Sequence, residues 1–253
     1  MQHPQLAVVY AGGVTIWRVG RAPDPWSWVD HQYAGKQRWD DSQGVFRTIY
    51  AADSLYACYV EILACFRPDL NAGGRELLAD IIEDPADATE YPTPPAGIVP
   101  RDWVNGRIES QATLTGAYVD VRASGTIAAL RPRFLTVALQ LGFEDFDAAA
   151  IKSAYPRDLT QQLATHIYGL VDDESEPRYA GVRFASRHGD ELAMLAIFER
   201  PGDEPSSCWV ERQQDALVDL ADPALAAALT LHGLRWDESI RTGHEAIRRG
   251  HDR

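Results

Sequence analysis

Cysteine is scarce in this sequence, and long apolar runs are missing. Cys58, Cys65 and Cys208 are the only three among 253 residues, and none belongs to a CxxC pair. An odd number at these spacings indicates neither a disulfide framework nor a zinc site, so we expect buried thiols in a reducing compartment. No stretch holds eighteen consecutive apolar residues, and MQHPQLAVVYAGGVTIWRV lacks the basic start and apolar run of a secretion signal. The sequence therefore predicts a cytoplasmic protein without a membrane partner.

Positive charge is also in short supply. Lys and Arg number 24 against 37 Asp and Glu, which gives a formal net charge of −13 at pH 7. This net negative charge opposes electrostatic binding to phosphate backbones or anionic membranes over a broad surface. We therefore expect no direct contact with nucleic acid, although a local group of arginines suffices to hold a phosphorylated small molecule.

Several common catalytic motifs have no counterpart in the sequence. There is no HExxH, no P-loop and no GxGxxG after a strand, so zinc peptidase, P-loop NTPase and Rossmann interpretations lack support. The segment SGTIAAL, at 124–130, has a serine and a glycine but not the nucleophile-elbow pattern. We predict no metal site.

The hydrophobic content of 45% is ample for a core, and strands and helices interleave irregularly. Strands are predicted at 13–19, 46–52, 180–186 and 192–199, with RHGD as the turn between the last two. Helices are predicted at 54–66, 124–140, 158–169, 206–220 and 223–232. The last is the best delimited, since Asp222 suits the N-cap, Pro223 the first helical position and Gly233 the C-terminal cap. The pattern predicts a mixed α+β fold with largely antiparallel sheets and flanking helices.

Glu61 lies on the predicted helix 54–66 and is the first residue that raises a question of function. The apolar stripe of this helix must face the core; its members are Leu55, Tyr59, Ile62, Leu63 and Phe66. Glu61 lies off that stripe, and its same-face neighbours are two small residues, Ala57 and Ala64. Periodicity alone favours a solvated helix face, but the carboxylate is uncrowded and accessible to a ligand.

Other candidate residues are also ambiguous when taken singly. Arg18 follows Trp17 in an apolar strand, and Arg38 sits in KQRWDD before a turn. A guanidinium at either place can bind a carboxylate or a phosphate through two hydrogen bonds, but a surface ion pair is the simpler interpretation. Tyr50 is more typical of a core aromatic than of a stacking platform, and His188 of a turn than of a catalytic site.

The order of these residues is more informative than any one of them. WRV, then RWDD, then TIYAADSLYACYVEIL and finally YAGVRFASRHGDELAMLAIFE together resemble the RES domain, named for its Arg, Glu and Ser. The positions that match the family pattern are Arg18, Arg38, Tyr50, Glu61 and Ser186. The resemblance covers roughly residues 14 to 200, and the turn departs from it in having Gln37 where the family has glycine.

The resemblance implies an ADP-ribosyltransferase-like fold and a function. Characterised RES proteins are toxins of bacterial toxin–antitoxin pairs that consume NAD+ by phosphorolysis or hydrolysis, or transfer ADP-ribose to a protein. On this basis Glu61, Arg38 and Ser186 are the expected catalytic residues, and Arg18 and Tyr50 the expected NAD-binding residues. NAD+ is the expected substrate, with no further cofactor, and a small helical antitoxin the expected protein partner.

The resemblance also divides the chain. Residues 1–205 are expected to form a RES-like catalytic domain and 206–253 a C-terminal helical extension packed on it. The extension and the Pro-rich segment 83–100 are each candidates to cover the pocket or bind a partner. A second hypothesis is a catalytically silent RES-like interaction module, and a third is a protein ADP-ribosyltransferase. The acceptor and a homo-oligomeric state are left open.

Overall fold

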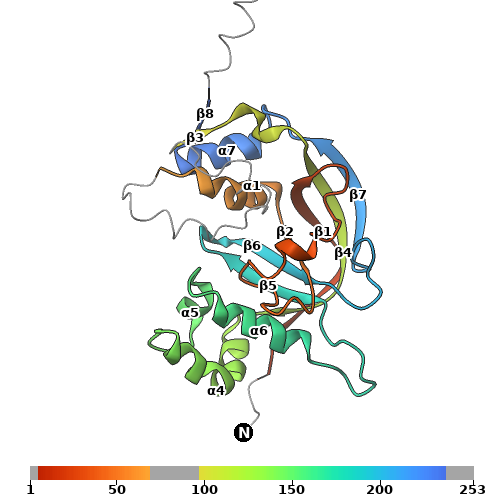
Figure 1. Ribbon diagram of the computed structural model, residues 1–253, viewed down its shortest axis with the longest axis vertical. Coiled ribbons are helices and arrows are strands. Elements are labelled where there is room, and N and C mark those ends of the chain that lie inside the picture. The colour runs from red at the N-terminus through yellow and green to blue at the C-terminus, as the bar shows by residue number, and fades with distance from the viewer. Residues whose placement is uncertain (1–4, 69–96, 238–253) are drawn as a thin grey trace, which may run out of the picture.

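A curved six-stranded sheet organises the chain, as seen in the computed structural model, which describes residues 5–68 and 97–237 (Figure 1). Its strands are β1 (Val8–Arg21), β2 (Thr48–Ala52), β4 (Arg107–Asp120), β5 (Gly181–Ser186), β6 (Gly189–Phe198) and β7 (Val210–Leu217). Two short strands, β3 (Ile98–Val99) and β8 (Arg235–Trp236), pair separately and in parallel. In the main sheet only β4 and β5 run parallel, and all other pairs are antiparallel. The predicted mixed α+β fold with largely antiparallel strands is confirmed.

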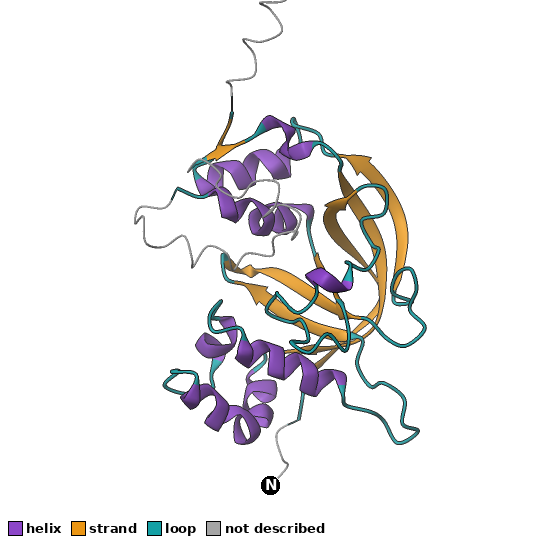
Figure 2. Ribbon diagram, in the orientation of Figure 1, coloured by secondary structure: helices purple, strands orange, loops and turns teal. Residues whose placement is uncertain are grey.

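Helices lie at two ends of this sheet (Figure 2). They are α1 (Leu55–Leu63), α4 (Ser124–Gln140), α5 (Ala148–Lys152), α6 (Asp158–Tyr168) and α7 (Pro223–His232), with short 3-10 turns η1 (His31–Tyr33), η2 (Ala64–Phe66) and η3 (Arg101–Val104). Figure 1 shows α1 and α7 together at one end and α4, α5 and α6 at the other. None of the described helices is both long and apolar enough to span a membrane.

The β1–β4 pair is the longest ladder of the fold. The strands run antiparallel from the Val8↔Val119 pair to the Arg21↔Arg107 pair. Only residues 13–19 of β1 were predicted as a strand from the sequence, and β4 was not predicted. The reason is that β4 buries polar residues: Ser110 is fully buried, where it accepts a hydrogen bond from Trp26 Nε1 at 2.6 Å and donates one to Asp215 Oδ1 at 2.5 Å. Apolar alternation, the usual strand signal, is therefore weak in this segment.

The predicted helix at 206–220 is wrong, because this segment contains β7. The polar run 211–214 has residue types that are compatible with a helix in isolation. In the fold, however, the backbone of this segment pairs antiparallel with β4, from Leu114↔Val210 to Ile108↔Leu217. The expected C-terminal helical extension thus starts with a strand of the main sheet. Residues 238–253 of that extension, and 83–96 of the Pro-rich segment, lie outside the described residues.

Other elements were predicted well. The bounds of α4 and α7 match the prediction, and the Asp222 carboxylate accepts hydrogen bonds from the N–H groups of Ala224 and Leu225. Gly233 ends α7 with a left-handed φ of 66°, as its role in a C-terminal cap requires. The predicted hairpin of β5 and β6 is confirmed, with β6 starting already at Gly189. Gly181 in β5 is required by packing, since a Cβ there would collide with the carbonyl oxygen of Ala196.

Candidate active site

Glu61 is buried, which overturns the solvated helix face that periodicity favoured. Only 5% of Glu61 is exposed to solvent. The N-cap Ser54, which accepts a hydrogen bond from the Ala57 N–H at 3.2 Å, fixes the start of α1 and so the direction in which Glu61 points. The expectation that Glu61 faces solvent failed because α1 packs against both the sheet and α7. Val60, on the same helix, is fully buried and accepts a hydrogen bond at its carbonyl oxygen from His232 Nε2 of α7 at 2.8 Å, with the ring nitrogen as donor.

Burial dominates the electrostatics of the Glu61 carboxyl and raises its pKa above the ordinary value of 4.5. A hydrogen bond from the Ser186 hydroxyl and the positive charges of Arg38 and Arg187 act in the opposite direction and favour the carboxylate. Ser186 is itself fully buried, and its oxygen accepts the His188 N–H at 2.9 Å. Glu61 is therefore a carboxyl in a low-polarity setting, oriented by one hydroxyl and approached by two cations.

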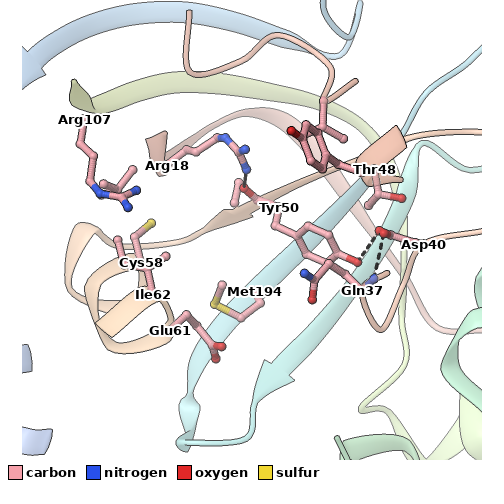
Figure 3. Close-up of a pocket in the computed structure, with 14 residues that line it drawn as sticks. Arg18, Gln37, Asp40, Thr48, Tyr50, Cys58, Glu61, Ile62, Arg107 and Met194 are labelled. Carbon is pink, nitrogen blue, oxygen red and sulfur yellow. Dashed lines mark hydrogen bonds between the residues drawn. The ribbon is translucent and has the colours of Figure 1, made fainter. Parts of the chain in front are cut away.

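A cavity of about 70 Å³ adjoins Glu61 (Figure 3). Two of the residues predicted for NAD binding, Arg18 and Tyr50, line it together with Glu61. A space of this size accommodates roughly two or three water molecules. Only the end of a larger ligand can enter it.

Arg18 and Arg107 bring two guanidinium groups to this cavity. Arg18 donates from Nε to the Pro25 carbonyl and from Nη1 to the Tyr50 carbonyl, both at 2.6 Å. Arg107 is 1% exposed, donates from Nε to the Trp103 carbonyl at 2.8 Å and lies over the Trp103 ring, 4.3 Å from its centroid. Sequence reasoning missed Arg107 because it missed β4, the strand that carries it.

Tyr50 is held by two hydrogen bonds at its phenol. The hydroxyl donates to Asp40 Oδ1 at 2.9 Å and accepts the Trp39 N–H at 3.0 Å. Burial, followed by the charge of Asp40, raises the pKa of Tyr50 well above its ordinary value. The ring packs edge-on against Phe184, with centroids 6.4 Å apart. Tyr50 therefore lines the cavity as a fixed, neutral aromatic wall.

Asp40, which sequence reasoning also missed, organises the turn beside the cavity. Its Oδ2 accepts the N–H groups of Lys36 at 3.0 Å and Gln37 at 2.9 Å. Burial raises the pKa of this carboxyl, while the hydrogen bonds to the backbone and to Tyr50 lower it. In the sequence, Asp40 resembles any other acidic residue of a surface turn, so only its position in the fold distinguishes it.

Arg38 and Ser186 do not line the cavity beside Glu61. Arg38 donates from Nη2 to the Ile151 carbonyl at 2.7 Å, lies over the Phe184 ring and faces a second, larger cavity. Its charge still acts on the Glu61 carboxyl, and Ser186 reaches Glu61 by a hydrogen bond. The fold thus brings all five predicted residues into one neighbourhood, with three on the cavity wall and two that act on Glu61 from beside it.

Comparison of the chain with family models, with curated proteins and with solved structures gives no match. Within the described part of the chain, no group of three or more His, Cys, Asp or Glu side chains is placed to hold a metal ion. A buried carboxylate next to guanidinium groups can stabilise a developing positive charge on a ligand whose anionic part the arginines hold.

Proposed function

We propose that this protein is an NAD+-consuming enzyme of RES type, with an ADP-ribosyltransferase-like fold, that breaks the bond between nicotinamide and ribose. The observation that carries the proposal is the position of Glu61. Its buried carboxyl accepts a hydrogen bond from Ser186 and lines a cavity together with Arg18 and Tyr50. The order of the motifs along the chain supports the same family. The charge balance of the site supports a ligand that has both a cationic ring and an anionic linker.

The reaction requires a carboxylate close to the ribose. When the bond from ribose C1′ to the nicotinamide nitrogen breaks, its electron pair leaves with nicotinamide, and positive charge develops on the sugar. The Glu61 carboxylate stabilises that charge. A water or phosphate oxygen then bonds to C1′, and a proton lost from water passes to the carboxylate.

The remaining residues position the substrate. Arg18 and Arg107 supply fixed positive charge on the wall of the cavity that takes the reacting end of the substrate, in a chain that carries a net charge of −13. Tyr50 offers an aromatic wall to the nicotinamide end, and its two hydrogen bonds keep that wall in place. Ser186 orients the carboxyl of Glu61.

The acceptor distinguishes the forms of this activity. Phosphate makes the protein an NAD+ phosphorylase, water a glycohydrolase and a protein side chain an ADP-ribosyltransferase. We propose phosphorolysis or hydrolysis first, because each needs only a small nucleophile and the cavity beside Glu61 has a volume of about 70 Å³. A catalytically silent interaction module is the alternative, in which NAD+ stays intact.

We further propose a toxin of the cytoplasm, where NAD+ is present and thiols stay reduced. Of the three cysteines expected to be buried, only Cys58 is; Cys65 is half-buried and Cys208 is exposed. The partner of the toxin is then a small helical antitoxin that blocks access to the cavity. Expression of the wild-type chain in a bacterium should deplete NAD+ and arrest growth. The Glu61→Gln variant should do neither, whereas Glu211→Gln, which removes an exposed carboxylate on β7, should behave as wild type. Growth arrest by Glu61→Gln with normal NAD+ loss would contradict this mechanism.

A further inference from the structure

A second cavity, of about 470 Å³, lies beside Arg38. This volume falls within the range of roughly 300–1,000 Å³ that is typical of small-molecule sites. The cavity beside Glu61 is far too small for a whole dinucleotide, so a substrate of that size needs a second place to lie. The larger cavity was not indicated by any sequence motif.

The two cavities are neighbours on either side of one turn. Arg38 lines the larger cavity, while Gln37 and Asp40 line the cavity beside Glu61. The walls are also in contact, because Phe184 of the larger cavity packs against Tyr50 of the smaller one. The charge of Arg38 acts on Glu61 across this wall. Arg38 therefore lies between the Glu61 carboxyl, on which its charge acts, and the larger cavity that it lines.

The lining of the larger cavity suits a flat ring joined to an anion. Apolar side chains form much of its wall, among them Val121, Ile151 and Phe184. Its charged lining residues are three cations, Arg38, Arg122 and Lys152, and two carboxylates, Asp120 and Asp190, which leaves one net positive charge. Both carboxylates are engaged by lining cations, Asp120 by Arg122 at 2.8 Å and Asp190 by Lys152 at 2.5 Å. A local positive balance in so acidic a chain favours a phosphorylated ligand.

The backbone at the start of α4 also favours a phosphorylated ligand. Arg122 and Ala123 line the cavity immediately before α4, and the N-cap Ala123 has no side chain that can accept a hydrogen bond from the first turn. The start of a helix of this length carries partial positive charge and exposes N–H donors. The first turn of α4 contains no acidic residue that would compete for them.

We propose that the larger cavity binds the adenosine diphosphate half of the substrate, with the phosphates near Arg38 and the start of α4 and the base on the apolar wall. This inference rests on the proposed function, which places the nicotinamide ribose beside Glu61. Arg38 then joins the two subsites, since it borders the phosphates on one side and supports the Glu61 carboxylate on the other. The ligand class is a nucleoside diphosphate.

Two adjacent alanines of α5 provide a matched test. Ala148 lines the larger cavity, while Ala149, its exposed neighbour on the same helix, does not. Titration calorimetry with ADP should show binding to the wild type and to Ala149→Trp, and at least about tenfold weaker binding to Ala148→Trp, whose indole fills the subsite. Glu211→Gln, which removes an exposed carboxylate on β7, should bind ADP as the wild type does. Absence of ADP binding, or equal affinity in both tryptophan variants, would overturn the proposal.

Kinetics separate this inference from the proposed function. Cleavage of NAD+ by Ala148→Trp should show a KM raised at least about tenfold, while cleavage of nicotinamide mononucleotide, which lacks the adenosine half, should be unchanged. If ADP binds as described but no variant cleaves NAD+, the subsite stands and the proposed function fails. If NAD+ is cleaved with the same KM in both tryptophan variants, the function stands and the subsite is overturned.

Discussion

Tyr50 donates a hydrogen bond from its phenol to Asp40 Oδ1 at 2.9 Å, and this contact closes the turn that carries Arg38. The same phenol accepts the Trp39 N–H, and the other oxygen of Asp40 accepts the N–H groups of Lys36 and Gln37. One buried pair thus satisfies three backbone donors. The position of Arg38 between the two cavities depends on it.

The first prediction concerns the stability of this turn. Tyr50→Phe leaves the Trp39 N–H without its acceptor and should lower the free energy of unfolding by roughly 1–2 kcal/mol. Asp40→Ala removes the acceptor of two N–H groups and of the phenol, and should cost roughly 2–3 kcal/mol. Because the two residues share one bond, their effects should couple by about 1 kcal/mol in a double-mutant cycle measured by urea unfolding.

Tyr155→Phe is the control for this cycle, since Tyr155 is 60% exposed. It should leave the free energy of unfolding within about 0.5 kcal/mol of the wild type. Strict additivity of Asp40→Ala and Tyr50→Phe would show that the two side chains do not hold the turn as a unit.

The second prediction follows from the raised pKa of the buried Glu61 carboxyl. A raised pKa in the folded state means that the folded protein keeps the proton at pH values where the unfolded chain, with a pKa near 4.5, has lost it. The stability that this group contributes is therefore present at low pH and is lost as pH rises through the folded pKa. Glu61→Gln lacks this dependence, so its stability relative to wild type should increase from about pH 4 to about pH 7.

Urea unfolding of both proteins across that range measures the difference. Glu211→Gln, which replaces an exposed carboxylate on β7, should run parallel to the wild type. A constant difference between Glu61→Gln and wild type at every pH would mean that the carboxyl of Glu61 titrates in the folded protein as it does in the unfolded chain.

The elements that could be predicted from sequence are those fixed by neighbouring residues. The bounds of α7 follow from Asp222 and Gly233, whose capping roles are local. The strand β7 could not be predicted in this way, because its conformation depends on pairing with β4, about a hundred residues earlier. Ser110 shows the same limit, since its burial in β4 makes sense only once Trp26 and Asp215 lie on either side of it.

The candidate site, too, could be predicted from the sequence only in part. The positions of Arg18, Arg38, Tyr50, Glu61 and Ser186 could be named from motif order, but which of them share a cavity could not. Helical periodicity placed Glu61 in solvent because it assumes a single buried face, whereas α1 is covered by the sheet and by α7. Asp40 and Arg107 carry no pattern in the sequence that separates them from surface charges.

The third prediction concerns His188, in the turn between β5 and β6. Burial and, after it, the charges of Arg187 and His232 lower its pKa from 6.5 to about 3, with Arg67 and Lys152 adding to the effect. The folded protein therefore keeps this ring neutral while the unfolded chain takes up a proton. The stability that His188 contributes is present above pH 6.5 and is lost as pH falls toward 3.

His188→Asn should remove that loss. We compare the free energy of unfolding of the wild type with that of His188→Asn. The difference should be constant above about pH 7.5, and the wild type should lose stability relative to the variant as the pH falls from about 6.5 to about 4.5. Superimposable pH profiles for the two proteins would contradict the lowered pKa.

The fourth prediction tests the sheet. Gly181→Ala drives a methyl group against the Ala196 carbonyl oxygen, in the centre of the sheet, and should cost at least about 3 kcal/mol in the free energy of unfolding. Gly12→Ala on β1 is the control, because nothing lies within 4 Å of the added methyl group, and the change should stay within about 1 kcal/mol. Equal stability of the two variants would show that β5 and β6 do not approach as closely as described.

The most direct test of the account is the product formed from NAD+ by the purified protein, identified by mass spectrometry with and without phosphate. Wild type and Glu211→Gln should release nicotinamide together with ADP-ribose or its phosphorylated form, and Glu61→Gln should be slower by about a hundredfold or more. The phosphate dependence of the product then identifies the acceptor. Intact NAD+ after incubation with wild type under both conditions, or equal turnover by Glu61→Gln, would contradict the assignment of Glu61 as the carboxylate that faces the ribose.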